Sequence, residues 1–293
     1  MNRKIINGPP TPLDHHSMIS YINTLTEKYS FLSVTSIGET ILGKSIPMLC
    51  IGNGEKSLLY VGSHKATDWK TSIILLEFIH DICESFQHGC SVCGLDLKYI
   101  NKMRSICIIP MLNPDGVDYN INGITESNPL YERVYAMNNK SLDFSNWISN
   151  ARGVDLDKNY MCQRTEQPAE EDPTTEGREG EWPESEPEIG SLCSFLRYNI
   201  NIKLVLSLHS TNEKTGTCQI NNNKYLHIIN RVAVSSGYKL TAKSNLGTNY
   251  GLSRWCEGIG TTAISIIAPT EKNSLHTTYA QLKESLFTLP TFI

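Results

Sequence analysis

The sequence predicts an α/β fold in which strands and helices alternate along a chain of 293 residues. Short apolar runs such as Leu58–Val61, Lys203–Leu208 and Thr262–Ala268 have the length and composition of buried strands. Longer segments such as Ser72–Cys83 and Glu188–Asn199 carry apolar residues at helical spacing. Because the two kinds of segment alternate, we expect a sheet that is covered by helices on both faces.

The remaining segments fit one continuous domain over residues 1–293, because we find neither an internal repeat nor a linker. Asn113–Gly116 has the composition of a tight turn, and the acidic stretch 161–187 reads as a surface loop that could act as a lid. The other predicted strands are Val34–Ile37, Ile46–Ile51 and Ser105–Met111, and the other predicted helices are Pro10–Tyr29, Lys224–Ser236 and Thr278–Leu289.

The composition is that of a globular protein, with 40% hydrophobic and 19% charged residues. A formal net charge of −4 gives no general attraction to nucleic acid or to an anionic membrane. The apolar runs fall short of the ~18 residues of a membrane span, and the opening residues lack the apolar core of a signal peptide. We therefore expect a cytoplasmic protein that binds neither nucleic acid nor membranes. The oligomeric state cannot be predicted from these features.

Nine cysteines in such a protein favour mostly reduced, buried thiols over a disulfide framework. Cys83, Cys90 and Cys93 lie near His88, and the spacing of the last two cysteines is found in structural zinc sites. A second pair with this spacing is missing from the sequence, so ordinary thiols are the preferred interpretation.

The stretch Leu58–Thr71 is where chemistry is expected. A buried strand ends at Gly62, a polar loop follows, and a helix begins after Trp69. Ligands of open α/β sheets bind beyond the carboxyl ends of the strands. The loop residues His64 and Asp68 therefore lie at the expected position of a functional site.

Several blocks occur in the order of one known family. YVGSHKATDW, NPDGV, NARGVDLDKNY, ESEPE and LVLSLHS together resemble the zinc carboxypeptidases, and within them the bacterial γ-D-glutamyl-diaminopimelate endopeptidases. The resemblance extends from about Pro10 to the final helix. It implies a single domain whose mixed, mostly parallel sheet of about eight strands lies between helices.

The resemblance also implies an altered metal site. The family holds zinc with a His-x-x-Glu pair and a later histidine, and a fourth position stays open for water. The later histidine corresponds to His209, whereas the turn at Gly62 and the following Trp69 place Lys65 and Asp68 at the positions of the pair. A lysine ammonium has no lone pair for a metal. We therefore expect no cofactor, with Lys65 as a fixed cation paired with Asp68 or Asp157.

The substrate-binding positions differ as well. The family's Asn-Arg pair, which binds the substrate carboxylate and polarises the scissile carbonyl, corresponds to Asp157 and Lys158. An acid at the first position would repel the carboxylate that an amide would bind. Arg152, just before GVD, remains a possible contact for an anion.

The general base of the family is a glutamate in a Thr-x-Glu setting on a late strand. By resemblance this position falls on Ser265, or on Ile264 if the register slips by one residue. The sequence contains no acid between Glu257 and Glu271. Without a carboxylate here, nothing evident would deprotonate a zinc-bound water.

A rearranged zinc site is the alternative. If the loop after Gly62 turns helically, His64 and Asp68 share one face, and with His209 they would form a ligand set that suits zinc. If the loop is extended, His64 and Lys65 point to opposite sides. Both conformations remain open at this point.

The sequence thus favours a degenerate peptidase that is inactive or nearly so and that binds a peptide or a muropeptide-like fragment of the cell-wall stem peptide. The alternative function is an active zinc metallopeptidase, either a carboxypeptidase or a γ-D-glutamyl-diamino acid endopeptidase. It would use the rearranged site of His64, Asp68 and His209.

Overall fold

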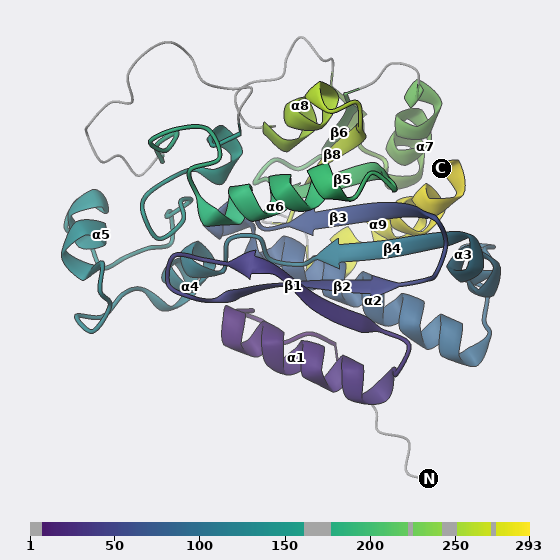
Figure 1. Ribbon diagram of the computed structural model, residues 1–293, viewed down its shortest axis with the longest axis horizontal. Coiled ribbons are helices and arrows are strands. Elements are labelled where there is room, and N and C mark those ends of the chain that lie inside the picture. Colours follow the sequence, from purple (N-terminus) through teal and green to yellow (C-terminus); the bar gives the residue numbers. More distant parts are fainter. Residues whose placement is uncertain (1–7, 161–176, 222–224, 242–250, 271–273) are drawn as a thin grey trace.

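The computed structural model describes residues 8–160, 177–221, 225–241, 251–270 and 274–293. An eight-stranded mixed sheet lies at its centre, with the strand order β1-β2-β4-β3-β5-β8-β6-β7 (Figure 1). The inner neighbours β4, β3, β5 and β8 run parallel to one another, so their carboxyl ends meet at one edge. The predicted fold class is confirmed. The strands are β1 (Ser33–Glu39), β2 (Ser45–Ile51), β3 (Lys56–Gly62), β4 (Arg104–Ile109), β5 (Ile202–Ser210), β6 (Thr217–Ile220), β7 (Lys239–Leu240) and β8 (Thr262–Ala268).

Helices cover both faces of the sheet (Figure 1). The larger core joins one face to α1, α2, α7 and α9, and a second core joins the other face to α6 and α8. The helices are α1 (His15–Lys28), α2 (Trp69–His88), α3 (Leu97–Met103), α4 (Pro114–Asn122), α5 (Tyr131–Met137), α6 (Pro187–Tyr198), α7 (Leu226–Ser236), α8 (Gly251–Gly258) and α9 (Leu275–Thr288), with 3-10 turns η1 (Ala66–Asp68), η2 (Leu156–Lys158) and η6 (Leu289–Phe292).

The side chains of β3 alternate between these two cores. Leu58 and Tyr60 belong to the larger core, whereas Leu59 and Val61 belong to the second one. Successive side chains of a strand point to opposite faces, so a continuous apolar run fits a strand that is buried on both sides. Each such buried side chain contributes about 1.5–3 kcal/mol to the free energy of folding.

The segment predicted as a tight turn instead begins a helix. Asn113 is the N-cap of α4, and its side chain accepts a hydrogen bond from the backbone N–H of Gly116. Pro114 occupies the first turn, where its missing N–H costs nothing. Capping and turn formation use the same residue types, so the local sequence did not distinguish them.

Most cysteines of the described residues are free thiols, as expected, but one pair forms a disulfide. Cys50 of β2 and Cys107 of β4 are direct partners in the antiparallel ladder, and their sulfur atoms are bonded. Six further cysteines of the described residues are free, among them buried Cys83 and exposed Cys90 and Cys93. Cys162 lies outside the described residues.

The predicted acidic loop lies mostly outside the described residues, which begin again at Gly177. Its last part, from Glu184 to Glu186, leads into α6. Within the described part of the chain, no helix combines the length and the apolar character needed to cross a membrane.

Candidate metal and catalytic site

The loop after β3 is folded into a compact polar turn. Ser63 has a positive φ of 49°, and its hydroxyl donates to the carbonyl oxygen of Asp68 at 2.9 Å. The backbone N–H of Ser63 donates to Oγ1 of Thr71, which in turn donates to the same carbonyl. These bonds fix the loop against the first turn of α2. As a result, His64 and Asp68 both lie at the carboxyl edge of the sheet.

His64, Asp157 and His209 meet at this edge. One ligand atom from each side chain lies within 4.8 Å of the others, and all three side chains are buried. The rings of His64 and His209 have centroids 5.3 Å apart. Nδ1 of His64 and both carboxylate oxygens of Asp157 have no hydrogen-bond partner among the described residues. Two imidazoles and a carboxylate are a donor set that zinc accepts, but the ammonium of Lys65, whose charge acts on all three side chains, opposes a dication here.

Tyr160 orients His64. Its hydroxyl lies 3.0 Å from Nε2 of His64, and both side chains are buried. This contact fixes the orientation of the imidazole ring beside Asp157 and His209. Tyr160 is the last residue of the NARGVDLDKNY block, and the sequence analysis did not assign it a role.

Asp68 also contacts His209, at the same ring nitrogen that Asp157 approaches. Its Oδ2 atom lies 3.5 Å from Nδ1 of His209, and its Oδ1 atom accepts hydrogen bonds from the backbone N–H and hydroxyl of Ser210. The predicted ligand set of His64, Asp68 and His209 is therefore brought to one place. However, Asp157 is the acid whose oxygen is grouped with the two histidines.

Lys65 lies beside a carboxylate that the sequence analysis did not single out. Its Nζ atom is 3.9 Å from Oδ2 of Asp155, which is buried. Lys65 is also close enough to His64, Asp157 and His209 to affect their titration. The cation is thus present at the site, and Asp155 is one of its partners.

Burial dominates the electrostatics of the cluster. Burial, together with the charges of His209 and Lys65, holds the pKa of His64 well below its ordinary value. Burial raises the pKa of Asp157 to about 7, although His209 opposes this shift. Burial also opposes the charged form of His209, but Asp157 and Asp68 outweigh it and raise the pKa of this imidazole. The result is a neutral His64 beside a His209 that is stabilised as a cation.

Arg152 and Lys158 contact other parts of the molecule. The guanidinium of Arg152 binds the buried carboxylate of Glu186 with distances of 3.1 and 3.0 Å. Nζ of Lys158 donates to the carbonyl oxygen of Gly177 at 3.1 Å. The Arg152 contact joins the NARGVDLDKNY block to the ESEPE block.

The residues named for the general base lie inside the sheet. Ser265 pairs with Ser207, and their hydroxyls are 3.0 Å apart, while Ile264 pairs with Leu206. The residue that pairs with His209 is Ile267. The whole of β8, TAISIIA, is without a carboxylate. The described residues therefore offer no acid from this strand to the cluster.

Among the described residues, the cluster of His64, Asp157 and His209 is the single group of potential metal ligands close enough together, and the cysteines near His88 are not part of such a group. Trp255 is buried in α8, and its indole N–H donates to Oε1 of Glu184 at 3.1 Å.

Comparison with known proteins agrees with this arrangement. The model of the zinc carboxypeptidase family matches residues 18–262. γ-D-glutamyl-L-diamino acid endopeptidase 1 of Lysinibacillus sphaericus is 31% identical over 209 residues, which cover 71% of this chain and 52% of that protein. Human carboxypeptidase B2 is 29% identical over 209 residues, covering 67% and 45%. The chain thus spans about half the length of these relatives.

Solved structures show the same fold. Thrombin activatable fibrinolysis inhibitor aligns with a TM-score of 0.72 and 15% identity, covering 96% of this chain and 74% of that one. Murein-tripeptide amidase of Escherichia coli O157 aligns with a TM-score of 0.56 and 16% identity, covering 88% and 91%. Together with the match to the family model, these comparisons establish that the chain belongs to the zinc carboxypeptidase family.

Proposed function

We propose that this chain is a zinc carboxypeptidase family member that does not hydrolyse peptides and that binds a peptide at the carboxyl edge of its sheet. The position of Asp157 carries this proposal. Its carboxylate, 1% exposed, lies 3.7 Å from Nδ1 of His209. An acid at this point pairs with the imidazole and repels the carboxylate of a substrate.

The lack of an acid on β8 supports the same conclusion. General acid–base catalysis contributes roughly 10²–10⁴-fold to the rate of such enzymes. Here Ile267 lies beside His209 in the ladder, and an isoleucine side chain cannot exchange a proton. Even with a metal bound, β8 would not supply a group that takes a proton from the attacking water.

The proposed ligand is a peptide that presents an amine, such as a muropeptide-like fragment with a diamino acid. The names of two similar proteins, a γ-D-glutamyl-L-diamino acid endopeptidase and a murein-tripeptide amidase, suggest this class. The charge of the site supports it. Three carboxylates, those of Asp68, Asp155 and Asp157, lie close together near the ammonium groups of Lys65 and Lys158. A ligand amine is therefore a better partner here than a ligand carboxylate.

The test combines catalysis with binding. The full chain is incubated with carboxypeptidase substrates and with γ-D-glutamyl-diaminopimelate peptides, with and without added zinc. We expect no turnover under either condition. Binding of the same peptides is measured by calorimetry, and a version with the diamino acid's side-chain amine acetylated should bind more weakly. Chelator-sensitive turnover by the natural sequence would refute the proposal of inactivity.

An active zinc peptidase is the second candidate, and one observation favours it. His64, Asp157 and His209 bring their ligand atoms within 4.8 Å of one another, and Nδ1 of His64 has no hydrogen-bond partner among the described residues. In this case Tyr160 would orient His64, and Asp68 would orient His209. Zinc at this site would polarise a carbonyl and activate water.

Metal content separates the two candidates. The protein is purified without chelator and its zinc is measured by atomic emission. The inactive protein should carry only trace zinc. About one zinc per chain that is lost in His64→Ala would instead support the second candidate, because that variant removes one of three ligands.

A further inference from the structure

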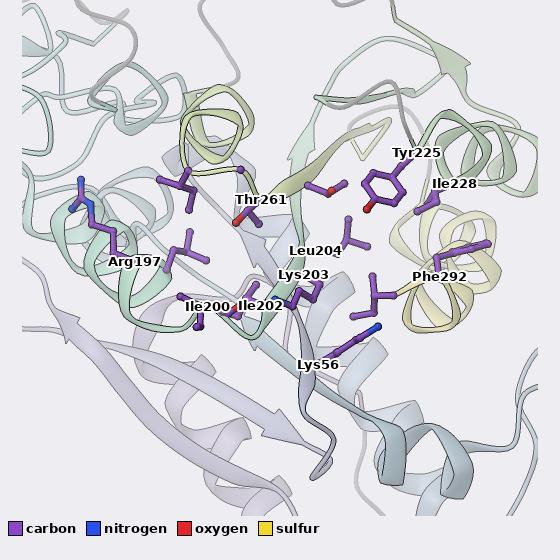
Figure 2. Close-up of a pocket in the computed structure, with 15 residues that line it drawn as sticks. Lys56, Arg197, Ile200, Ile202, Lys203, Leu204, Tyr225, Ile228, Thr261 and Phe292 are labelled. Atoms are coloured by element: carbon purple, nitrogen blue, oxygen red, sulfur yellow. Dashed lines mark hydrogen bonds between the residues drawn. The ribbon is translucent and has the colours of Figure 1, made fainter.

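A cavity lies at the end of the parallel strands opposite to the candidate catalytic site. It has a volume of about 590 Å³ and is lined by the amino ends of β3, β5 and β8, by the end of α6, by the start of α7, and by η6 (Figure 2). His209 lies at the carboxyl end of β5, so this cavity is separate from the candidate catalytic site. Its volume is within the range of about 300–1,000 Å³ that is typical of small-molecule sites.

A β-bulge opens this cavity. Ser57 pairs with Ile202 and Leu58 pairs with Leu204, so Lys203 is an extra residue in β5. The ladder between β5 and β8 begins only at Leu204. Bulges redirect the side chain of the extra residue and interrupt pairing. Here the extra residue is Lys203, which lines the cavity just before the pairing of β5 with β8 begins.

The walls of the cavity combine polar surface with an apolar part. Ile202 and Leu204 come from β5, Ile228 comes from α7, and Phe292 comes from η6 (Figure 2). Ile200 lies at the rim of the cavity, and its side chain is 82% exposed. Burial of an isoleucine side chain is energetically favourable. An apolar ligand group in this cavity would cover such surface.

The charged side chains that line the cavity in the described residues are all basic. The described residues that line it include Lys56, Arg197 and Lys203 and no acidic side chain. Arg197 is neutralised by an ion pair with Glu184. Nζ of Lys203 donates to the carbonyl oxygen of Ile200 at 2.7 Å, which is an uncharged partner. Lys56 lies at the first position of β3 and is exposed. Two ammonium groups thus lie at a cavity that is partly apolar.

We propose that this cavity binds an amphipathic organic anion, with its apolar body between Ile202, Leu204 and Phe292 and its acidic group at Lys203 and Lys56. The apolar part of the walls selects the body of the ligand, and the ammonium groups select a carboxylate or an equivalent acid. A charge-assisted hydrogen bond to a lysine provides the orientation. This inference is independent of the function proposed for the catalytic edge.

The full chain is titrated with the fluorescent anion 1-anilinonaphthalene-8-sulfonate, and decanoate, decanol and decyltrimethylammonium are then added as competitors. We expect one sulfonate probe bound per chain and displacement by decanoate. Decanol and decyltrimethylammonium should compete at least about tenfold more weakly, since a hydrogen bond to a charged group is worth that factor or more. Equal competition by all three would overturn the proposal.

Variants locate the binding site. Lys203→Met should weaken decanoate binding by about tenfold or more, whereas Lys214→Met, at an exposed lysine beyond the other end of β5, should not. Ile259→Trp narrows the rim of the cavity and should also weaken binding, whereas Val234→Trp, on an exposed position of α7, is its control. His209→Ala should leave decanoate binding unchanged.

Circular dichroism and thermal melting establish that each variant is folded. Ile259 is 40% exposed, so its replacement keeps the test valid even if Lys203→Met disturbs the bulge. Unchanged decanoate affinity in folded Ile259→Trp and Lys203→Met would overturn the assignment of the cavity.

Discussion

Oδ2 of Asp157 lies 3.7 Å from Nδ1 of His209, in a buried pair that joins η2 to the end of β5. The resemblance to zinc carboxypeptidases places an asparagine amide at position 157 and a metal ligand at position 209. The acid at 157 is therefore a partner of the histidine in this structure. Under the function proposed above, Lys65 is one of several changes that would have to be reversed for zinc to bind.

Restoring three positions should restore zinc. Lys65→His and Asp68→Glu supply the family's paired ligands, and Asp157→Asn removes the acid that pairs with His209. We expect zinc content to rise from trace to about one ion per chain, because three protein ligands complete an open zinc site. Atomic emission of the purified protein measures it.

The matched control adds His209→Ala to the same three changes and should bind no zinc. Lys65→Ala alone should also bind none, because it removes the cation without supplying a ligand. Stoichiometric zinc in the natural sequence would show that the present side chains already form a metal site.

A glutamate introduced at position 267 should act as a general base, whereas a glutamate at position 265 should not. Ile267 pairs with His209, whereas Ser265 lies two residues deeper in the strand and is fully buried. In the triple variant with restored zinc ligands, Ile267→Glu should raise peptide hydrolysis by roughly 10²-fold or more over its parent. Ser265→Glu should leave hydrolysis at the level of the parent and lower its stability. In the natural background, both single changes should remain inactive for lack of metal.

Much of the fold followed from the sequence because it depends on apolar periodicity. Most of the buried strands and the long helices were predicted within a few residues. A continuous apolar run such as Leu58–Val61 is stable mainly as a strand that is buried on both faces. The helix after Asn113 was missed, because a cap and a turn use the same chemistry. The Cys50–Cys107 bond depends on strand register, which the sequence alone did not supply.

For the site, the sequence indicated the edge of the sheet and most of its residues, but not their partners. His64, Asp68, Asp157 and His209 do meet. The ion pair of Lys65 with Asp155 and the contact of Tyr160 with His64 depend on how η2 packs against the loop after β3. Such contacts join segments far apart in the chain and leave no local pattern.

The Arg152–Glu186 pair should be structural. Glu186 is 1% exposed and Arg152 is a third exposed, and two hydrogen bonds join them. Arg152→Met leaves a buried carboxylate without its cation, which should lower the free energy of unfolding by about 2–4 kcal/mol. Urea denaturation measures this loss. The double variant Arg152→Met with Glu186→Gln should lose less stability, because it has no buried carboxylate without a cation. Unchanged stability of Arg152→Met would instead fit a role in binding an anion.

Glu188 should make the stability of the protein depend on pH. Its side chain is fully buried in the first turn of α6, and burial, with the charges of Glu186 and Asp115, raises its pKa to about 8. The ordinary value of a glutamate is 4.5. Between these two values the folded chain holds a proton that the unfolded chain releases. The stabilisation is therefore complete below the unfolded pKa and is lost as pH rises through the folded one.

Comparison with Glu188→Gln isolates this contribution, because the amide fills the same space and does not titrate. Between about pH 5 and pH 8, the free energy of unfolding of the natural protein should fall relative to the variant by up to about 1.4 kcal/mol per pH unit. Urea denaturation at several pH values gives both curves. Leu142→Gln, at an exposed position, should change stability equally at every pH. If the natural protein and Glu188→Gln show parallel curves, Glu188 is charged in the folded state, and the hydrogen bond from Asn150 outweighs its burial.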